Sequence, residues 1–220
     1  MNFSAILFDF DGTLGATAAD IRRSWLAAIA ELQLRCDRFD SAFRVGPSVP
    51  ETAALLFPDA DEAVQRQVAT AYKRIYDEAE NYTAAPYPGI VAAVRVLART
   101  AKIFIVTNKR IKPTLKLLNK FGLTELCAGI VTPDIVAPEH PLSKPEMSGL
   151  AFRLSGAPLP SRVLMVGDTE IDIAAGRSQG MATCGVTWGY GDPAKLREMR
   201  PDYLIGRPEE LLDARIQPLA

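Results

Sequence analysis

Short apolar stretches recur along the chain, and segments with an apolar residue every three or four positions lie between most of them. Stretches rich in Ile, Val, Leu and Phe suit strands that are buried on both faces of a sheet. The predicted strands are Ala5–Phe8, Ile103–Val106, Gly129–Val131, Val163–Val166, Thr183–Val186 and Tyr203–Ile205. The predicted helices between them are Ile90–Leu97, Pro113–Phe121, Met147–Leu154 and Ile171–Gln179. Strand and helix alternate, which predicts an α/β fold built on a parallel sheet.

The alternation is interrupted once, because the first strand ends near Asp9 and the next begins only near Lys102. The interval contains segments of helical spacing rather than further strands. They are residues 18–34, residues 61–80 and a shorter candidate at Glu51–Phe57. A small helical domain is therefore expected to be inserted after the first strand.

Helix-breaking segments flank this interval on both sides. Gly15–Thr17 follows the first strand, and prolines and a glycine interrupt the segment Thr83–Gly89. We therefore predict that residues 1–15 and 85–220 form the α/β core and that residues 16–84 form the inserted domain.

Composition narrows the class of protein. The chain has 220 residues, of which 48% are hydrophobic, and a formal net charge of −1, as is typical of a soluble globular protein without a basic nucleic-acid surface. Residues 1–8 lack a charged stretch before an apolar one, and no run of about 18 apolar residues occurs. Neither a signal peptide nor a membrane span is therefore expected, and the expected location is the cytoplasm.

Two carboxylates follow the first predicted strand directly, in the run Asp9-Phe10-Asp11-Gly12-Thr13. Open parallel sheets place their ligand crevice at the carboxyl ends of the strands. Two acids this close raise each other's proton affinity unless a cation neutralises them, so a magnesium ion is the simplest companion of the pair. A solvated acidic turn is the plainer alternative for an Asp-Gly pair taken alone.

The residues from Phe8 to Leu14 resemble the first motif of the haloacid dehalogenase superfamily, whose phosphatases carry D-x-D-G-T at the end of their first core strand. The other three motifs of this family have counterparts in the same order. They are Ile105-Val106-Thr107-Asn108, Ser143-Lys144-Pro145 and Gly167-Asp168-Thr169-Glu170-Ile171-Asp172. The four matches span most of the chain and three of them lie at strand ends, which argues strongly against coincidence.

The resemblance implies phosphatase chemistry at five residues. Asp9 would attack phosphorus and form an aspartyl-phosphate, which splits hydrolysis into two easier steps. Asp11 would protonate the leaving oxygen and later take a proton from the attacking water. Thr107, Asn108 and Lys144 would bind the phosphoryl group, whose negative charge needs fixed donors around it.

The resemblance also implies a metal site. Asp9, Asp168 and the backbone carbonyl of Asp11 would hold Mg²⁺, and Asp172 would steady the site from close by. Taken alone, Asp168 and Asp172 have a plainer interpretation as acids at the start of a helix. A Thr-Asn pair is likewise common as a helix cap, and a lysine before proline is usually solvated.

The resemblance further implies a Rossmann-like parallel-sheet core with helices on both faces and a small all-helical cap that closes over the site and contacts the leaving group. Arg44 resembles a substrate-contacting arginine of some relatives, with a solvated surface arginine as the alternative. Thr107-Asn108-Lys109 and the run from Asp172 to Arg177 most resemble phosphoglycolate phosphatases and nearby hydrolases. Many such relatives continue after Leu14 with Asp-Ser, where this chain has Gly15-Ala16-Thr17.

The expected function is Mg²⁺-dependent hydrolysis of a phosphate monoester of a small metabolite, with no nucleic-acid or membrane partner. Asp11 favours phosphate chemistry, because the dehalogenases of the superfamily lack this second acid. One alternative is a phosphomutase, although the only histidine, His140, lies outside the insertion where a helper residue would be sought. The other alternative is a binding or regulatory protein that keeps the site without catalysis.

Overall fold

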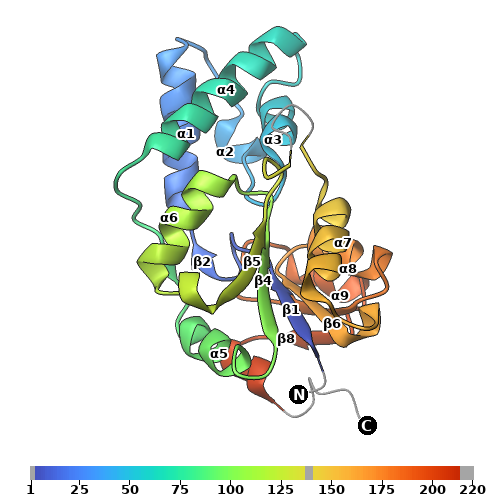
Figure 1. The fold of residues 1–220 in the computed structure, drawn as a ribbon. Coiled ribbons are helices and arrows are strands. Elements are labelled where there is room, and N and C mark those ends of the chain that lie inside the picture. Colours follow the sequence, from blue (N-terminus) through green and yellow to red (C-terminus); the bar gives the residue numbers. More distant parts are fainter. Residues whose placement is uncertain (1–2, 137–140, 214–220) are drawn as a thin grey trace.

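The computed structural model describes residues 3–136 and 141–213, so His140 lies outside the described residues. Its centre is a six-stranded parallel sheet in the spatial order β5-β4-β1-β6-β7-β8 (Figure 1). The strands are β1 (Ala5–Phe8), β4 (Lys102–Val106), β5 (Cys127–Val131), β6 (Val163–Gly167), β7 (Ala182–Val186) and β8 (Tyr203–Ile205). All six predicted strands are confirmed, each to within two residues at either end.

Helices cover both faces of the sheet. Alternate residues of each strand point to opposite sides, so each strand contributes apolar side chains to both faces. Ile6 and Phe8 of β1 share a core with α5 and α6, whereas Ala5 and Leu7 share another with α7. Helix α8 covers this second face, since Gly176 lies against the side chain of Met165. These helices are α5 (Ile90–Leu97), α6 (Ile111–Phe121), α7 (Lys144–Ser155) and α8 (Glu170–Ser178). The predicted Rossmann-like arrangement is therefore confirmed.

The four helices between β1 and α5 lie beyond the carboxyl ends of the strands (Figure 1). They are α1 (Ala18–Glu31), α2 (Phe39–Ala42), α3 (Val49–Leu56) and α4 (Glu62–Glu78). The ring of Trp25 in α1 stacks on Tyr72 in α4 with 4.2 Å between ring centroids, which ties the two longest of them together. Helix α2 was not predicted, because four residues are too few for a helical period to show.

The remaining helical elements of the described residues are short. They are α9 (Pro193–Glu198) and three 3-10 helices, Thr124–Leu126, Pro160–Arg162 and Pro208–Leu212. Within the described ranges, no helix combines the length and the apolar composition that crossing a membrane requires.

The two segments that connect the inserted helices to the sheet pair with each other. Strand β2 (Gly15–Ala16) runs antiparallel to β3 (Ala85–Pro86), so the entry and the exit of the insertion form one short ribbon. Asp20, at the start of α1, accepts hydrogen bonds from the backbone N–H groups of Thr83 (3.0 Å) and Ala84 (2.8 Å). The first inserted helix is therefore fastened to the returning chain.

Replacing Asp20 with alanine is expected to destabilise the fold by about 2–3 kcal/mol, because the buried N–H of Ala84 and the partly buried N–H of Thr83 lose their acceptor. Burial by itself raises the pKa of Asp20, but the hydrogen bonds from Thr83 and Ala84 lower it below its ordinary value of 3.8. The stability difference from wild type should therefore be full above pH 3.8 and shrink as the pH falls through the lowered pKa. Urea unfolding at a series of pH values measures this difference in the free energy of unfolding, and Asp59→Ala, at an exposed aspartate, is the control. An equal stability at neutral pH would contradict the assignment.

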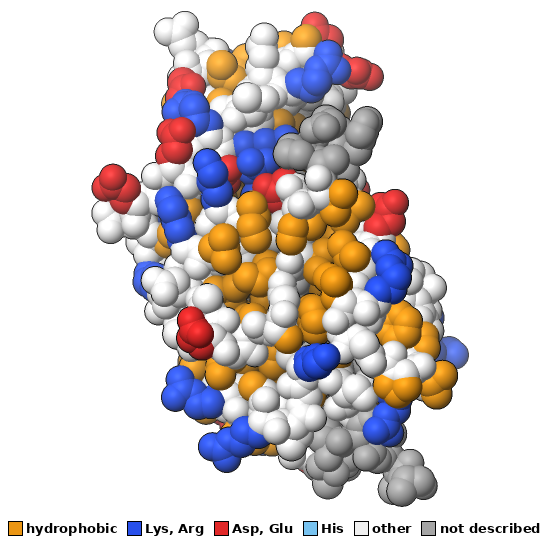
Figure 2. Space-filling model, in the orientation of Figure 1, with side chains coloured by type: hydrophobic (Ala, Val, Ile, Leu, Met, Phe, Trp, Pro, Cys, Tyr) orange, Lys and Arg blue, Asp and Glu red, His pale blue; other side chains and the backbone are white. Residues whose placement is uncertain are grey.

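Charged side chains gather where the inserted helices meet the core. Arg110 Nε donates to Asp77 Oδ2 at 2.9 Å, and Lys116 Nζ donates to the backbone carbonyl of Asp77 at 2.9 Å. Figure 2 shows basic and acidic side chains next to each other at this level, above a more apolar area of the core. Asp77 at the end of α4 is thus bound to the residue that precedes α6 by an ion pair and to α6 itself by a hydrogen bond.

Candidate active site

Three neighbouring strands deliver the predicted site residues to one edge of the sheet. Asp9 follows β1, Thr107 follows β4 and Asp168 follows β6, and β1 pairs directly with both other strands. Because the three strands are parallel, their carboxyl ends lie side by side. The structure therefore brings the first, second and fourth motifs together.

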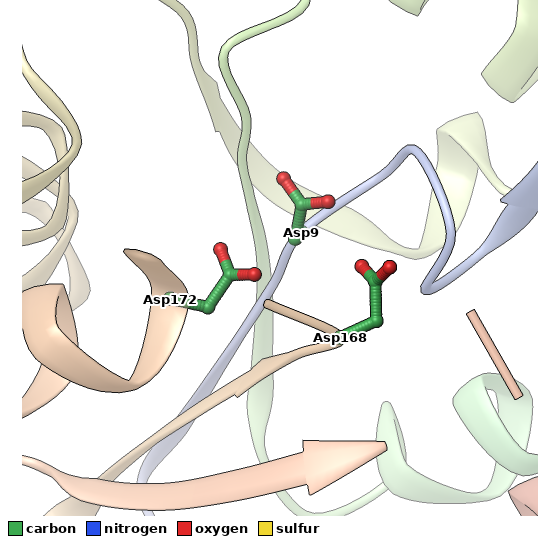
Figure 3. A group of neighbouring side chains, drawn as sticks. All are labelled: Asp9, Asp168 and Asp172. Atoms are coloured by element: carbon green, nitrogen blue, oxygen red, sulfur yellow. The ribbon is translucent and has the colours of Figure 1, made fainter. Parts of the chain in front are cut away.

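Three buried carboxylates converge at this edge (Figure 3). Asp9, Asp168 and Asp172 each offer an oxygen, and these three oxygens lie within 4.8 Å of one another. Their relative exposures are 7%, 0% and 2%, so water screens their mutual repulsion poorly. Oxygen ligands in this number suit a hard divalent cation such as Mg²⁺.

Asp168 is held in place by hydrogen bonds from segments far away in the sequence. Its carboxylate accepts from Thr13 Oγ1 at 3.0 Å and from the backbone N–H groups of Tyr190 at 2.7 Å and Gly191 at 3.2 Å. Burial raises the pKa of Asp168 to about 6, the charge of Asp172 adds to the rise, and these hydrogen bonds oppose it. The side chain is therefore oriented before any ligand arrives.

Gly12 is required by this arrangement. Its φ of +91° is in the left-handed region, and a Cβ at this position would lie 2.2 Å from Asp168 Oδ2. The glycine of the first motif thus lets the loop pass close to the carboxylate of the fourth.

Lys144 bridges two of the three carboxylates. Its Nζ lies 2.5 Å from Asp9 Oδ1 and 2.9 Å from Asp172 Oδ1. It is the first residue of α7, whose start is specified by a capping box between Ser143 and Glu146. Although burial by itself lowers a lysine pKa, the charges of Asp172 and Asp9 raise the pKa of Lys144 above its usual value. The lysine therefore stays cationic between its partners.

One ammonium group does not balance three carboxylates. Burial raises the pKa of Asp9 to about 8, and Asp172, Asp168 and Asp11 add to the rise, although Lys144 opposes it. A divalent cation would remove this excess of negative charge and return Asp9 to its carboxylate form. The donor set and its charge thus fit the magnesium ion expected from the sequence.

The second motif lies at the same edge. Thr107 Oγ1 accepts the backbone N–H of Lys109 at 3.2 Å, which leaves the hydroxyl hydrogen for an incoming anion. Asn108 Nδ2 donates at 3.0 Å to the carbonyl of Gly46, which belongs to the inserted segment. Asn108 therefore also ties the insertion to the core, a contact that the motif did not predict.

Asp11 is not one of the three converging carboxylates and has partners of its own. Its Oδ1 accepts from Thr17 Oγ1 at 2.6 Å and lies 2.8 Å from Lys109 Nζ. Lys109 also donates to Tyr76 Oη at 2.7 Å. Neither Lys109 nor Tyr76 was predicted as a site residue, and the only signal was that Lys109 directly follows the Thr-Asn pair of the second motif.

A cavity of about 50 Å³ lies above these groups, between the core and the inserted helices. Part of the cavity wall is formed by aromatic side chains of the inserted helices, those of Trp25, Tyr72 and Tyr76. Arg44 also lines it, but the residue is exposed and its Nη1 donates to the carbonyl of Ser41 at 3.2 Å. The other lining residues that the sequence singled out are Asp9, Asp11, Thr107, Asn108, Lys144 and Asp172.

Comparison with known proteins found a matching family model and similar proteins. A family model described as haloacid dehalogenase-like hydrolase matches residues 6–186. Two proteins of Bacillus cereus named pyrophosphatase PpaX, from strains AH820 and ATCC 10987, are 30% and 31% identical to this chain. Each of these matches covers 96% of this chain and 96% of the relative.

Solved structures share the fold. A haloacid dehalogenase-like family hydrolase of Streptococcus pneumoniae superposes with a TM-score of 0.84 at 24% identity, over 98% of this chain and 99% of that one. A protein described as a predicted phosphoglycolate phosphatase of Haemophilus somnus superposes with a TM-score of 0.79 at 22% identity, over 96% and 97% of the two chains.

Proposed function

The chain belongs to the haloacid dehalogenase-like hydrolase family, and on this premise we propose that it releases inorganic phosphate from a small phosphorylated metabolite through attack of Asp9 on phosphorus. One observation carries the proposal. Asp9 lines the cavity between the core and the inserted helices, 2.5 Å from the ammonium group of Lys144, and a second acid, Asp11, lines the same cavity. An oxygen nucleophile, a fixed cation and an acid are the groups that phosphoryl transfer needs.

In the first step, a carboxylate oxygen of Asp9 forms a bond to phosphorus while the bond from phosphorus to the leaving oxygen breaks. Lys144, the Thr107 hydroxyl and Asn108 bind the phosphoryl oxygens, on which negative charge accumulates. For Asn108 this requires a donor other than the N–H now given to Gly46, and its amide carries a second one.

Asp11 moves the proton in both steps. It gives a proton to the leaving oxygen in the first step and takes one from the water that attacks the aspartyl-phosphate in the second. Phosphate leaves and Asp9 is regenerated as a carboxylate. The position of Asp11 apart from the other carboxylates supports this division of roles, since it lies beside the cavity without belonging to the converging group.

Asp9, Asp168 and the backbone carbonyl of Asp11 are the proposed magnesium ligands, and Asp172 lies close enough to contribute an oxygen. The ion supplies charge neutralisation, which allows an anionic substrate to approach Asp9. Asp172 also holds Lys144, so its carboxylate orients a phosphate-binding group in either case.

The inserted segment, residues 16–84, is proposed to act as a cap over the core formed by residues 1–15 and 85–220. The aromatic wall from α1 and α4 and the small cavity support this role, because they limit the space beside the leaving group. We therefore expect the substrate to be small. Because the relatives are named pyrophosphatases, inorganic pyrophosphate is a second candidate substrate beside small phosphate monoesters.

Phosphate release from a panel of small phosphate esters and pyrophosphate tests the proposal. With Mg²⁺ we expect release from at least one compound, and with excess chelator we expect release to fall to background, because three carboxylates then face one ammonium group. Chelator already saturated with Mg²⁺ is the control. Full activity in excess chelator would contradict the metal site, and no release from any compound would contradict the phosphatase assignment.

A further inference from the structure

Lys109 is a buried lysine whose charge the proposed mechanism does not use. Its side chain is 2% exposed, and it stands two residues beyond Thr107 in the loop after β4. A lysine is almost never buried unless it is paired, because removing its charge from water is costly. Its partners therefore indicate what retains it there.

Both oxygens of Asp11 are within reach of this ammonium group. Lys109 Nζ lies 2.8 Å from Asp11 Oδ1 and 3.1 Å from Oδ2. Its third polar contact is Tyr76 Oη at 2.7 Å, and it also lies 4.5 Å from the centroid of the Tyr76 ring. Among the described residues, Asp11 is the one carboxylate with which Lys109 forms an ion pair.

The two proposed catalytic acids thus have separate lysines. Lys144 contacts Asp9 and Asp172, whereas Lys109 contacts Asp11, which is not one of the three converging carboxylates. Thr17 Oγ1 supports Asp11 from the insertion side at 2.6 Å. This arrangement separates the attacking acid from the proton-transferring acid, and it depends on fixed contacts to both.

We infer that Lys109 is a positioning residue that aims the carboxyl group of Asp11 at the leaving oxygen, and that Tyr76 of α4 completes this alignment from the cap side. The inference rests on the proposed function, since it concerns the proton step of that reaction. Tyr76 lies on an inserted helix while Lys109 and Asp11 lie on core loops, so the acid is aligned through a contact between cap and core. Asp11 transfers the proton, and Lys109 acts only through it.

This role has a consequence that a purely structural or phosphate-binding lysine does not share. The alkoxide that departs from an alkyl phosphate must be protonated as it leaves, whereas 4-nitrophenolate leaves readily without a proton. A misaligned acid should therefore slow alkyl phosphates far more than 4-nitrophenyl phosphate. General-acid catalysis contributes roughly 10²–10⁴-fold in rate, which bounds the difference.

The experiment compares kcat/KM for 4-nitrophenyl phosphate and for the best alkyl phosphate of the panel, because kcat/KM reports the step in which the leaving group departs. For Lys109→Met we expect a loss of about 10²-fold with the alkyl phosphate and of less than about 5-fold with the aryl phosphate. Lys112→Met, at an exposed lysine of α6, is the matched control and should change neither value.

Tyr76→Phe provides a test that does not depend on removing a buried charge. It keeps the ring that stacks on Tyr72 and removes only the hydroxyl that Lys109 contacts. The same selectivity is expected at smaller size, about 5–10-fold with the alkyl phosphate and little change with the aryl phosphate.

Equal losses with both substrates, or no loss in either variant, would overturn the inference. The proposed function fails in a different way, through phosphate release that survives Asp9→Asn. If Lys109→Met does not fold, as judged by circular dichroism and urea unfolding, the selectivity of Tyr76→Phe decides alone.

Discussion

Replacing Asp9 with asparagine is expected to lower phosphate release by at least about 10⁴-fold, because a neutral amide is a poor nucleophile towards phosphorus. The change preserves the size of the side chain at a position that is 7% exposed, so the core should accommodate it. It also removes one of three converging carboxylates and so relieves their mutual repulsion. A loss of activity is therefore expected to reflect lost chemistry rather than unfolding. Phosphate release with Mg²⁺ and the preferred substrate measures the effect.

The matched control for this variant is Asp59→Asn, at an exposed aspartate far from the site in the sequence, which should keep full activity. Trapping with hydroxylamine offers an independent readout, because it converts an aspartyl-phosphate into a hydroxamate that mass spectrometry locates. Modification at residue 9 of the wild-type enzyme is expected during turnover. Modification elsewhere, or undiminished activity of Asp9→Asn, would assign the nucleophile to another group.

Replacing Lys144 with methionine is expected to have the largest effect on stability, about 3–5 kcal/mol in the presence of chelator, because it leaves buried carboxylates without their cation. Activity should fall as well, by roughly 10²–10³-fold, since a fixed charge on the phosphoryl group is lost. Urea unfolding measures the first effect and phosphate release the second.

Magnesium should restore part of the lost stability of Lys144→Met, because a ligand that binds the folded state alone shifts the unfolding equilibrium. The increase in stability on adding Mg²⁺ should therefore exceed that of wild type. Lys112→Met, which replaces an exposed lysine, serves as the control for both measurements. A variant as stable as wild type in chelator would show that Lys144 does not neutralise the cluster.

The sequence by itself determined the core and the order of its elements. Runs such as Ala5–Phe8 and Val163–Val166 are apolar at every position and only four residues long, which suits a strand covered on both faces. Helix Ile90–Leu97 could be predicted to the residue, because its apolar spacing ends where the chain becomes polar. The candidate residues Asp9, Thr107 and Asp168 were identified by the resemblance of their motifs to those of the family, and each of them follows a predicted strand.

Only the tertiary structure decided how these residues are held and what separates them. Thr13 and Asp168 are 155 residues apart, and Lys109 and Asp11 are 98 apart, yet each pair is in hydrogen-bonding contact. Local propensity and periodicity describe neighbours within a few positions, so they carry no signal for such pairs. The contact between Tyr76 and Lys109 further depends on how an inserted helix lies over the sheet, which packing between distant segments determines.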